Sequence, residues 1–166
     1  MADSLIIIPT FNEKENIEKI IRKVFSLEKL FHILIVDDGS PDGTAAIVKK
    51  LQSQFPNQLH IEERAGKLGL GTAYIHGFKW ALQRDYQFIF EMDADFSHNP
   101  DDLIRLYNAN LHDGGELAIG SRYVKGVNIV NWPMSRLLMS FFASKYVKLI
   151  TGMPIHDSTA GFKCYK

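Results

Sequence analysis

The sequence has little that would stabilise a secreted protein or draw it to a charged polymer. Cys164 is the only cysteine, which excludes an internal disulfide and suits a reducing compartment. The 19 basic and 19 acidic side chains cancel to a net charge of zero, so no overall field favours nucleic acid or an anionic membrane. Any phosphate that the protein binds must therefore be held by local groups.

Export and membrane-spanning segments are also missing from the sequence. An apolar run begins at Leu5 with no basic segment before it, unlike a secretory signal. Arg136, Lys145 and Lys148 interrupt the most apolar region, so no stretch reaches the length of a membrane span. We therefore expect a soluble, cytoplasmic domain.

Three common nucleotide- or cation-binding signatures are absent as well. The P-loop pattern G-x-x-x-x-G-K-S/T does not occur. The glycine-rich run 66–71 lacks the third glycine of a dinucleotide fingerprint, because Tyr74 stands in its place. Residues 93–98 lack the spacing and the glycine of an EF-hand loop. Any nucleotide must then be bound in another way.

Apolar runs of strand type alternate along the chain with segments of helical periodicity. The expected strands cover residues 5–8, 33–36, 59–61, 88–90 and 117–120. The expected helices cover residues 16–27 and 72–83 and include the apolar stripes at 47–51 and 103–111. This alternation predicts an α/β fold in which a mainly parallel, Rossmann-like sheet is flanked by helices.

Polar clusters follow four of the expected strands. They lie at residues 10–13, 37–40, 93–98 and 121–123. Ligands of open parallel sheets bind beyond the carboxyl ends of the strands. The sequence therefore predicts an active site along that edge of the sheet.

Asp93 and Asp95 follow the apolar strand at 88–90 and form the most informative of these clusters. Alternation along a strand would place both carboxylates on one side, where they repel each other and lose hydration. A divalent cation relieves both penalties, and oxygen ligands favour Mg²⁺ or Mn²⁺. An alternative is a polar turn that caps the next helix, but Asp101 and Asp102 already fill that role. We predict that the pair holds Mg²⁺ or Mn²⁺.

Six motifs stand in order along nearly the whole chain. They are PTFNE (9–13), VDDGSPDGT (36–44), KLGLGTAYIHG (67–77), DADFSHNP (93–100), GSRY (120–123) and DSTAGFKCY (157–165). Together they resemble the inverting glycosyltransferase family 2, and within it the polyprenol- or dolichyl-phosphate mannosyltransferases. The resemblance implies a GT-A fold and transfer of a sugar, with GDP-mannose the expected donor, to a polyprenyl or dolichyl phosphate.

The resemblance also assigns roles to individual positions. The residues expected at the nucleotide are Pro9, Phe11, Glu13, Val36 and Asp38, and those at the metal and diphosphate are Asp93, Ala94, Asp95 and Arg122. Among these, Asp93, Asp95 and Arg122 form the expected catalytic set, and Asp157 is expected on the acceptor side. The family usually has tyrosine where this chain has Phe11, so one hydroxyl contact is lost.

Simpler interpretations remain open for several of these residues. Glu13 is also placed to begin the first helix, where carboxylates are favoured. Asp38 also fits an ordinary turn, and Lys67 a solvated loop. His98 follows the acidic pair, but a single histidine is more often a hydrogen-bonding surface residue than a metal ligand.

The segment from residue 127 to residue 153 differs in character, because its apolar residues cover most sides of a helix. Such a helix is either buried or in contact with lipid, and its basic residues would then reach anionic headgroups. The resemblance favours docking of the acceptor at the cytoplasmic face of a membrane. We therefore divide the chain into a nucleotide-sugar core (1–126) and an acceptor-side segment (127–166). Family members continue further, so we expect the chain to be a C-terminally truncated part.

Three alternative functions stay open. A UDP-sugar-dependent enzyme of the glucosyl type would keep the fold and the metal. A nucleotidyltransferase also presents paired acids to Mg²⁺, but basic residues for a triphosphate would be expected near the first strand, and PTFNE offers none. The third alternative is a nucleotide-sugar-binding module without turnover.

Overall fold

The computed structural model describes residues 2–112, 114–121, 134–153, 155, 157 and 159–166. A six-stranded sheet runs in the order β3-β2-β1-β4-β6-β5. Its strands are β1 (Ser4–Thr10), β2 (His32–Asp37), β3 (Leu59–Glu63), β4 (Phe88–Glu91), β5 (Leu117–Ile119) and β6 (Lys163–Tyr165). The helices are α1 (Ile17–Phe25), α2 (Thr44–Gln52), α3 (Leu70–Ala81), α4 (Asp102–His112) and α5 (Met134–Thr151).

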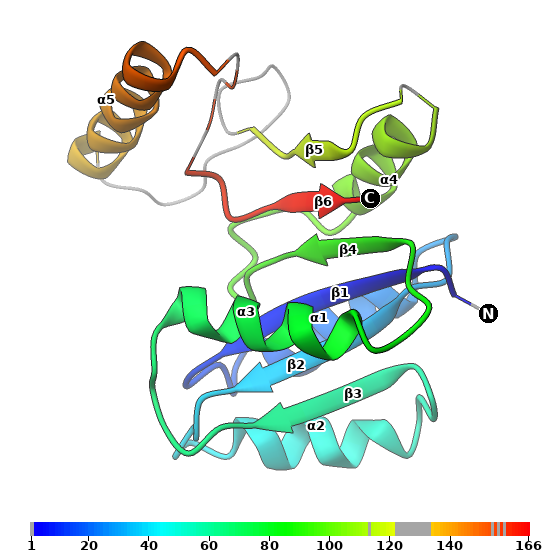
Figure 1. Cartoon of the computed structure of the whole chain (residues 1–166). Helices are drawn as coiled ribbons and strands as arrows, with labels where there is room; N and C mark the ends of the chain where they lie inside the picture. Colours follow the sequence, from blue (N-terminus) through cyan, green and yellow to red (C-terminus); the bar gives the residue numbers. More distant parts are fainter. Residues whose placement is uncertain (1, 113, 122–133, 154, 156, 158) are drawn as a thin grey trace.

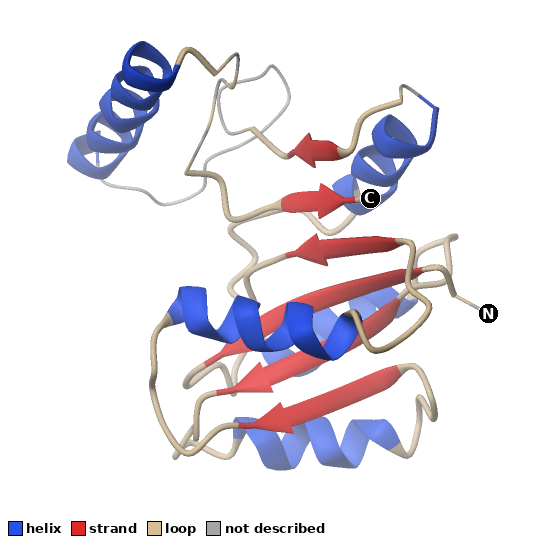
Figure 2. Ribbon diagram, in the orientation of Figure 1, coloured by secondary structure: helices blue, strands red, loops and turns tan. Residues whose placement is uncertain are grey.

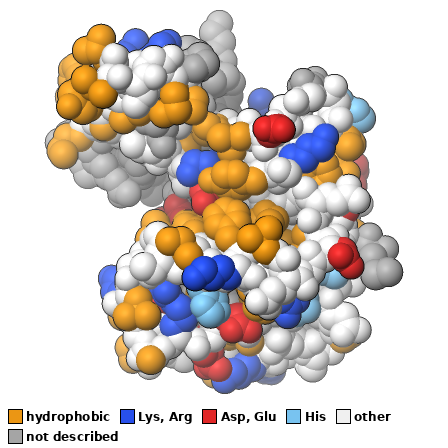
Figure 3. Space-filling model, viewed as in Figure 1, with side chains coloured by type: hydrophobic (Ala, Val, Ile, Leu, Met, Phe, Trp, Pro, Cys, Tyr) orange, Lys and Arg blue, Asp and Glu red, His pale blue; other side chains and the backbone are white. Residues whose placement is uncertain are grey.

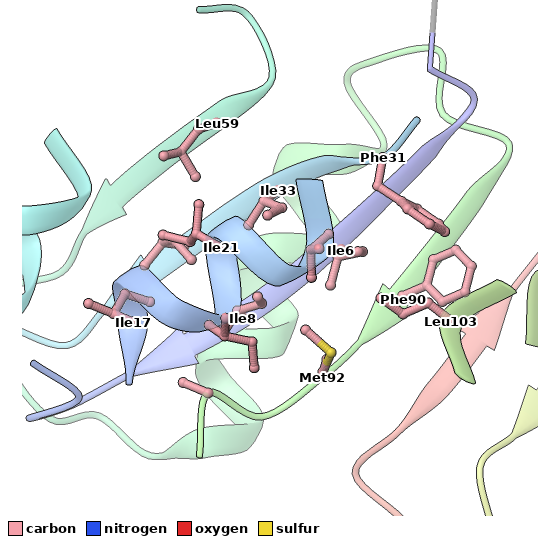
Figure 4. Close-up of a cluster of buried hydrophobic side chains, with 14 of the residues drawn as sticks. Ile6, Ile8, Ile17, Ile21, Phe31, Ile33, Leu59, Phe90, Met92 and Leu103 are labelled. Carbon is pink, nitrogen blue, oxygen red and sulfur yellow. The ribbon is translucent and has the colours of Figure 1, made fainter. Parts of the chain in front are cut away.

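Alternate side chains of β1 point into two separate cores. Ile6 and Ile8 face α1 and join the larger core, to which α2 and α4 also contribute; Figure 4 shows Ile17 and Ile21 of α1 packed over this face. Leu5 and Ile7 face the opposite way, onto α3. Figures 1 and 2 show the resulting three layers, with α3 alone in front of the central strands and α1 and α2 behind them. The predicted sheet flanked by helices is therefore confirmed.

The strand order reverses next to β1. β1 pairs in parallel with both β2 and β4, while β2 pairs in parallel with β3 on its outer side. The connections from β1 and from β4 therefore lead away in opposite directions. Such a reversal opens a crevice at the carboxyl ends of the two strands, and open α/β sheets bind ligands there.

The sequence did not predict β6, which lies between β4 and β5. It is antiparallel to both neighbours, with Phe90 and Ala118 each opposite Cys164. Asn110 of α4 fixes the strand from behind by donating its Nδ2 to the carbonyl oxygen of Cys164 at 2.8 Å. The end of the acceptor-side segment is thus part of the central sheet.

The remaining differences from the predicted elements are small, except at the acidic pair. β4 ends at Glu91, so Asp93 and Asp95 lie in the following loop and not on the strand. Strand alternation therefore does not set their direction. Among the described residues, no helix is long and apolar enough to cross a membrane.

Candidate active site

A cleft of about 240 Å³ lies at the reversal point. Its residues come from the loops after β1, β2 and β4 and from the start of α3. They are Pro9, Thr10, Phe11, Glu13, Asp38, Lys67, Leu70, Ala73, Asp93, Ala94 and Asp95. Seven of the residues that the sequence assigned to a nucleotide sugar or its metal are thus brought together at one edge of the sheet.

Hydrogen bonds join the first two loops into one wall of the cleft. The backbone N–H groups of Asn12, Glu13 and Lys14 donate to the side chains of Ser40, Thr44 and Asp42, each at 3.0 Å. Below them, the Thr10 hydroxyl donates to the buried Asp37 carboxylate at 2.9 Å. Three N–H groups of the first loop are thus bound by side chains of the second loop. These bonds fix the position of Phe11 and Glu13 relative to Asp38.

Glu13 both starts α1 and lies in the wall of the cleft. Its carbonyl oxygen accepts the N–H groups of Asn16 and Ile17 at 3.0 and 2.9 Å, which starts α1. Its carboxylate accepts a hydrogen bond from Asn16 Nδ2 at 3.2 Å, and the residue also lines the cleft. The helix start and the cleft wall are therefore compatible assignments.

Asp38 is nearly buried and forms an ion pair with Arg64, which follows β3. Arg64 Nε donates to Asp38 Oδ1 at 2.6 Å, and each of the two side chains is 8% exposed. Lys67 lies a few residues further on, with its ammonium 4.7 Å from the centre of the Phe11 ring. One end of the cleft thus offers a flat ring, a cation and a fixed carboxylate, which suits a nucleoside.

The other end of the cleft is acidic. Burial and the charge of Asp95 raise the pKa of Asp93 to about 6, because both disfavour a second negative charge there. The Tyr74 hydroxyl, from α3, donates to Asp93 Oδ1 at 3.2 Å. Asp95 is exposed, and its Oδ1 accepts the N–H of Ser97 at 2.9 Å. Two carboxylates therefore meet at this end, one partly buried and one open to solvent.

These two carboxylates suit an Mg²⁺ or Mn²⁺ ion that is also bound by water and substrate, and they do not form a site made of protein ligands alone. Within the described part of the chain, no group of three or more His, Cys, Asp or Glu side chains is arranged to hold a metal. Mg²⁺ characteristically takes one or two carboxylates and completes its shell with water and substrate phosphates. The raised pKa of Asp93 is the signature of uncompensated negative charge, which a cation would neutralise.

The raised pKa of Asp93 predicts that its ionised carboxylate destabilises the metal-free protein. Ionisation of a carboxyl whose folded pKa is raised favours the unfolded chain, so the penalty is absent below about pH 4 and complete above the folded value of about 6. In EDTA at pH 7.5, Asp93→Asn should raise the free energy of unfolding by about 2 kcal/mol. At pH 4 the gain should vanish, as measured by urea denaturation at both pH values.

Asp37→Asn is the matched control for this prediction. Its carboxylate accepts hydrogen bonds from Thr10 Oγ1, Ser40 Oγ and the Ser40 N–H, so the amide should lower stability at pH 7.5. Equal stabilities of wild type and Asp93→Asn at pH 7.5 would contradict the assignment of an uncompensated charge to Asp93.

The three predicted site residues Val36, Asp157 and Arg122, and also His98, lie away from the cleft or outside the described residues. Val36 is fully buried in the core under α3, so its side chain does not line the cleft. Asp157 is buried in the loop before β6, where it accepts a hydrogen bond from Thr159 at 3.3 Å. His98 is also buried, with its ring stacked on Phe162 at 5.0 Å. Arg122 lies outside the described residues.

Sequence reasoning missed Arg64 and Tyr74. Arg64 directly follows β3, Asp38 directly follows β2, and the two strands are neighbours. The signal in the sequence that indicates Arg64 is its place shortly after the third expected strand. In the sequence, Tyr74 stands only where a dinucleotide fingerprint would have its third glycine. No local pattern indicates its contact with Asp93, which depends on how α3 packs on the sheet.

The family model for glycosyl transferase family 2 matches residues 5–166. The chain belongs to glycosyl transferase family 2. Within this family, it is 48% identical over 163 residues to the polyprenol monophosphomannose synthase of Mycolicibacterium smegmatis. That match covers 98% of this chain but 61% of the relative, so the chain spans less than two thirds of that relative's length.

Solved structures extend the comparison to the fold. A mannosyltransferase from Pyrobaculum calidifontis, in complex with GDP-Man and Mn²⁺, matches with a TM-score of 0.68 at 17% identity, over 99% of this chain and 44% of that one. Glucosyl-3-phosphoglycerate synthase from Mycobacterium tuberculosis, with Mn²⁺, UDP-glucose and phosphoglyceric acid, matches with a TM-score of 0.69 at 17% identity, over 98% and 56%. The expected GT-A fold is confirmed.

Proposed function

We propose that this chain binds GDP-mannose with Mg²⁺ or Mn²⁺ and belongs to an enzyme that transfers the mannose, with inversion, to a polyprenyl phosphate. The observation that carries the proposal is that one cleft has an end suited to a nucleoside and an end with two carboxylates. One nucleotide sugar with its metal could contact both ends. The polyprenol monophosphomannose synthase to which the chain is similar supports the choice of sugar and acceptor.

The described residues divide the donor between the two ends of the cleft. Phe11 and Lys67 would both contact the base, and Asp38 would accept a hydrogen bond from the base or the ribose. Asp93 and Asp95 would hold the metal at the diphosphate. A divalent cation held by these two carboxylates would supply positive charge to the leaving diphosphate.

The reaction requires little acid–base chemistry from the protein. The bond between the anomeric carbon and the donor diphosphate breaks while a bond to an oxygen of the acceptor phosphate forms on the opposite face. The acceptor phosphate is already anionic at neutral pH, so no side chain has to remove a proton from it. The main contribution of the cleft is to orient the donor and to stabilise charge.

α5 supports a lipid acceptor at a membrane surface. Met139, Phe142, Leu149 and Ile150 are between 64% and 82% exposed, and Figure 3 shows hydrophobic side chains gathered on this helix beside basic ones. Apolar side chains flanked by lysines suit the interface of an anionic membrane. We assign this helix to the docking of the polyprenyl chain, at a peripheral position on the membrane.

Calorimetric titration tests the donor assignment. GDP, GDP-mannose, UDP and UDP-glucose are each titrated into the chain with Mn²⁺ and, separately, with EDTA. We expect GDP and GDP-mannose to bind at least about tenfold more tightly than the uracil ligands, and EDTA to weaken this binding by about 100-fold or more. Turnover with a short polyprenyl phosphate then separates an enzyme from a binding module.

UDP-sugars are the second candidate class of donor, because one structure of similar fold contains UDP-glucose and Mn²⁺. Preference for uracil in the titration would replace GDP-mannose by a UDP-sugar and leave the metal assignment intact. Absence of binding by all four ligands would overturn the proposal.

A further inference from the structure

We propose that Arg64 is a positioning residue for the nucleoside part of the donor. It holds the Asp38 carboxylate and the loop of residues 64–69 in the arrangement that the nucleoside contacts. The inference rests on the proposed function, because it concerns the same cleft. Arg64 itself does not line that cleft, so it acts through the residues that it fixes.

The Arg64 guanidinium links the residue after β2 to the start of α3. Its Nε donates to Asp38 Oδ1 at 2.6 Å, and its Nη2 contacts the same oxygen. Its Nη1 donates to the Thr72 hydroxyl at 2.8 Å, and Nη2 also reaches the Gly69 carbonyl at 3.3 Å. Because the guanidinium is a rigid planar fork, the end of β2 and the start of α3 are held at one mutual angle.

On the β2 side, Arg64 sets which oxygen of Asp38 the donor meets. Both guanidinium contacts fall on Oδ1, which leaves Oδ2 as the acceptor for a ribose hydroxyl or a base N–H. The pair is almost buried, with 8% exposure on each side, so water competes weakly for these contacts. Asp38 is therefore presented to the cleft in one orientation.

On the α3 side, Arg64 contacts the end of the loop of residues 64–69 through the Gly69 carbonyl and the Thr72 hydroxyl. Gly69 has a φ of +99°, a conformation that side chains disfavour, and nothing lies within 4 Å of a Cβ placed there. The loop carries Lys67, whose ammonium lies 4.7 Å from the centre of the Phe11 ring. The anchoring of Gly69 and Thr72 thus determines how Lys67 covers the base end.

The acidic end of the cleft has no direct contact with Arg64. Asp93 is held by Tyr74, and Asp95 by the N–H of Ser97. Loss of the Arg64 fork should therefore weaken contacts to the nucleoside and leave contacts to the diphosphate and metal unchanged. A purely structural role would weaken both.

The experiment compares Arg64→Lys and Arg64→Met with wild type by calorimetry. The probes are GDP, UDP and pyrophosphate, each with Mn²⁺. We expect Arg64→Lys to weaken the nucleotide that wild type prefers by about tenfold, and Arg64→Met to weaken it further. Pyrophosphate should bind all three proteins within about twofold. Arg22→Lys is the matched control, because Arg22 pairs with Glu18 on the exposed face of α1 and should change neither affinity.

Arg64→Met leaves the buried Asp38 carboxylate without its cation and should lower stability. If that variant does not fold, Arg64→Lys, which keeps a cation, decides the question. Unchanged nucleotide affinity in folded Arg64→Lys would overturn the positioning role alone, and so would equal losses for nucleotide and pyrophosphate. A wild type that binds neither GDP nor UDP would overturn the proposed function and this role with it.

Discussion

Asp95→Ala should abolish the metal-dependent part of nucleotide binding, lowering the affinity for GDP in the presence of Mn²⁺ by about 100-fold or more. Asp95 is the exposed member of the acidic pair, and Asp93 alone would offer one partly buried carboxylate to the cation. The residual affinity should match that of wild type in EDTA. Calorimetry of both proteins with and without Mn²⁺ makes the comparison.

The substitution should cost little stability, which separates a binding defect from misfolding. Asp95 accepts one hydrogen bond, from the Ser97 N–H at 2.9 Å, and losing it in an exposed loop is worth about 1 kcal/mol or less. Asp85→Ala, an exposed aspartate beyond the far end of α3, is the control and should bind GDP as wild type does. If folded Asp95→Ala retained Mn²⁺-dependent binding, the assignment of the metal to this pair would be wrong.

Gly77→Ala should lower the free energy of unfolding by about 3 kcal/mol, through overpacking between α3 and the sheet. A Cβ at Gly77 would lie 2.6 Å from Cγ2 and 3.0 Å from Cδ1 of Ile7. Ile7 is fully buried in the middle of β1, so it has no space into which to move. Either α3 lifts from the sheet or Ile7 leaves its rotamer, and urea denaturation measures the cost.

Gly71→Ala provides a control on the same helix. Nothing lies within 4 Å of a Cβ at Gly71, and alanine is the better helix former, so stability should stay equal or rise by about 0.5 kcal/mol. The difference between the two variants isolates the contact with Ile7 from the general effect of alanine in a helix. Equal stabilities would show that α3 does not pack as closely on β1 as described.

The central layers were predictable because their residues follow short, regular patterns. Leu5 to Ile8 form an apolar run that ends at Pro9, and Ile17, Ile20, Ile21 and Val24 recur with helical spacing. Such runs have one way to bury their apolar surface in an α/β sheet. The edge at which Asp38, Asp93 and Asp95 meet then followed from the rule for carboxyl ends of parallel strands.

The unpredicted features depend on contacts between residues far apart in sequence. β6 has three residues, and two of them, Lys163 and Tyr165, are polar, so no apolar run marks it as a strand. Its place in the sheet comes from pairing with β4 and from the Asn110 contact. The Arg64–Asp38 pair joins positions 26 apart, and hydrophobic periodicity carries no information about such ion pairs.

The late position of β6 in the chain has a consequence for synthesis on the ribosome. β1 to β4 lie within residues 4–91, so the four strands that lead into Asp38 and the acidic loop can assemble while β5 and β6 are still being translated. β4 then stays an open edge until Lys163, 72 positions beyond Glu91, emerges and β6 pairs with it. In that interval the edge is exposed to pairing with other chains, and the arrival of β6 both closes it and brings Gly161 against Asp93. Pairing of β6 thus closes the sheet edge at β4 and encloses the acidic end of the cleft at the same time.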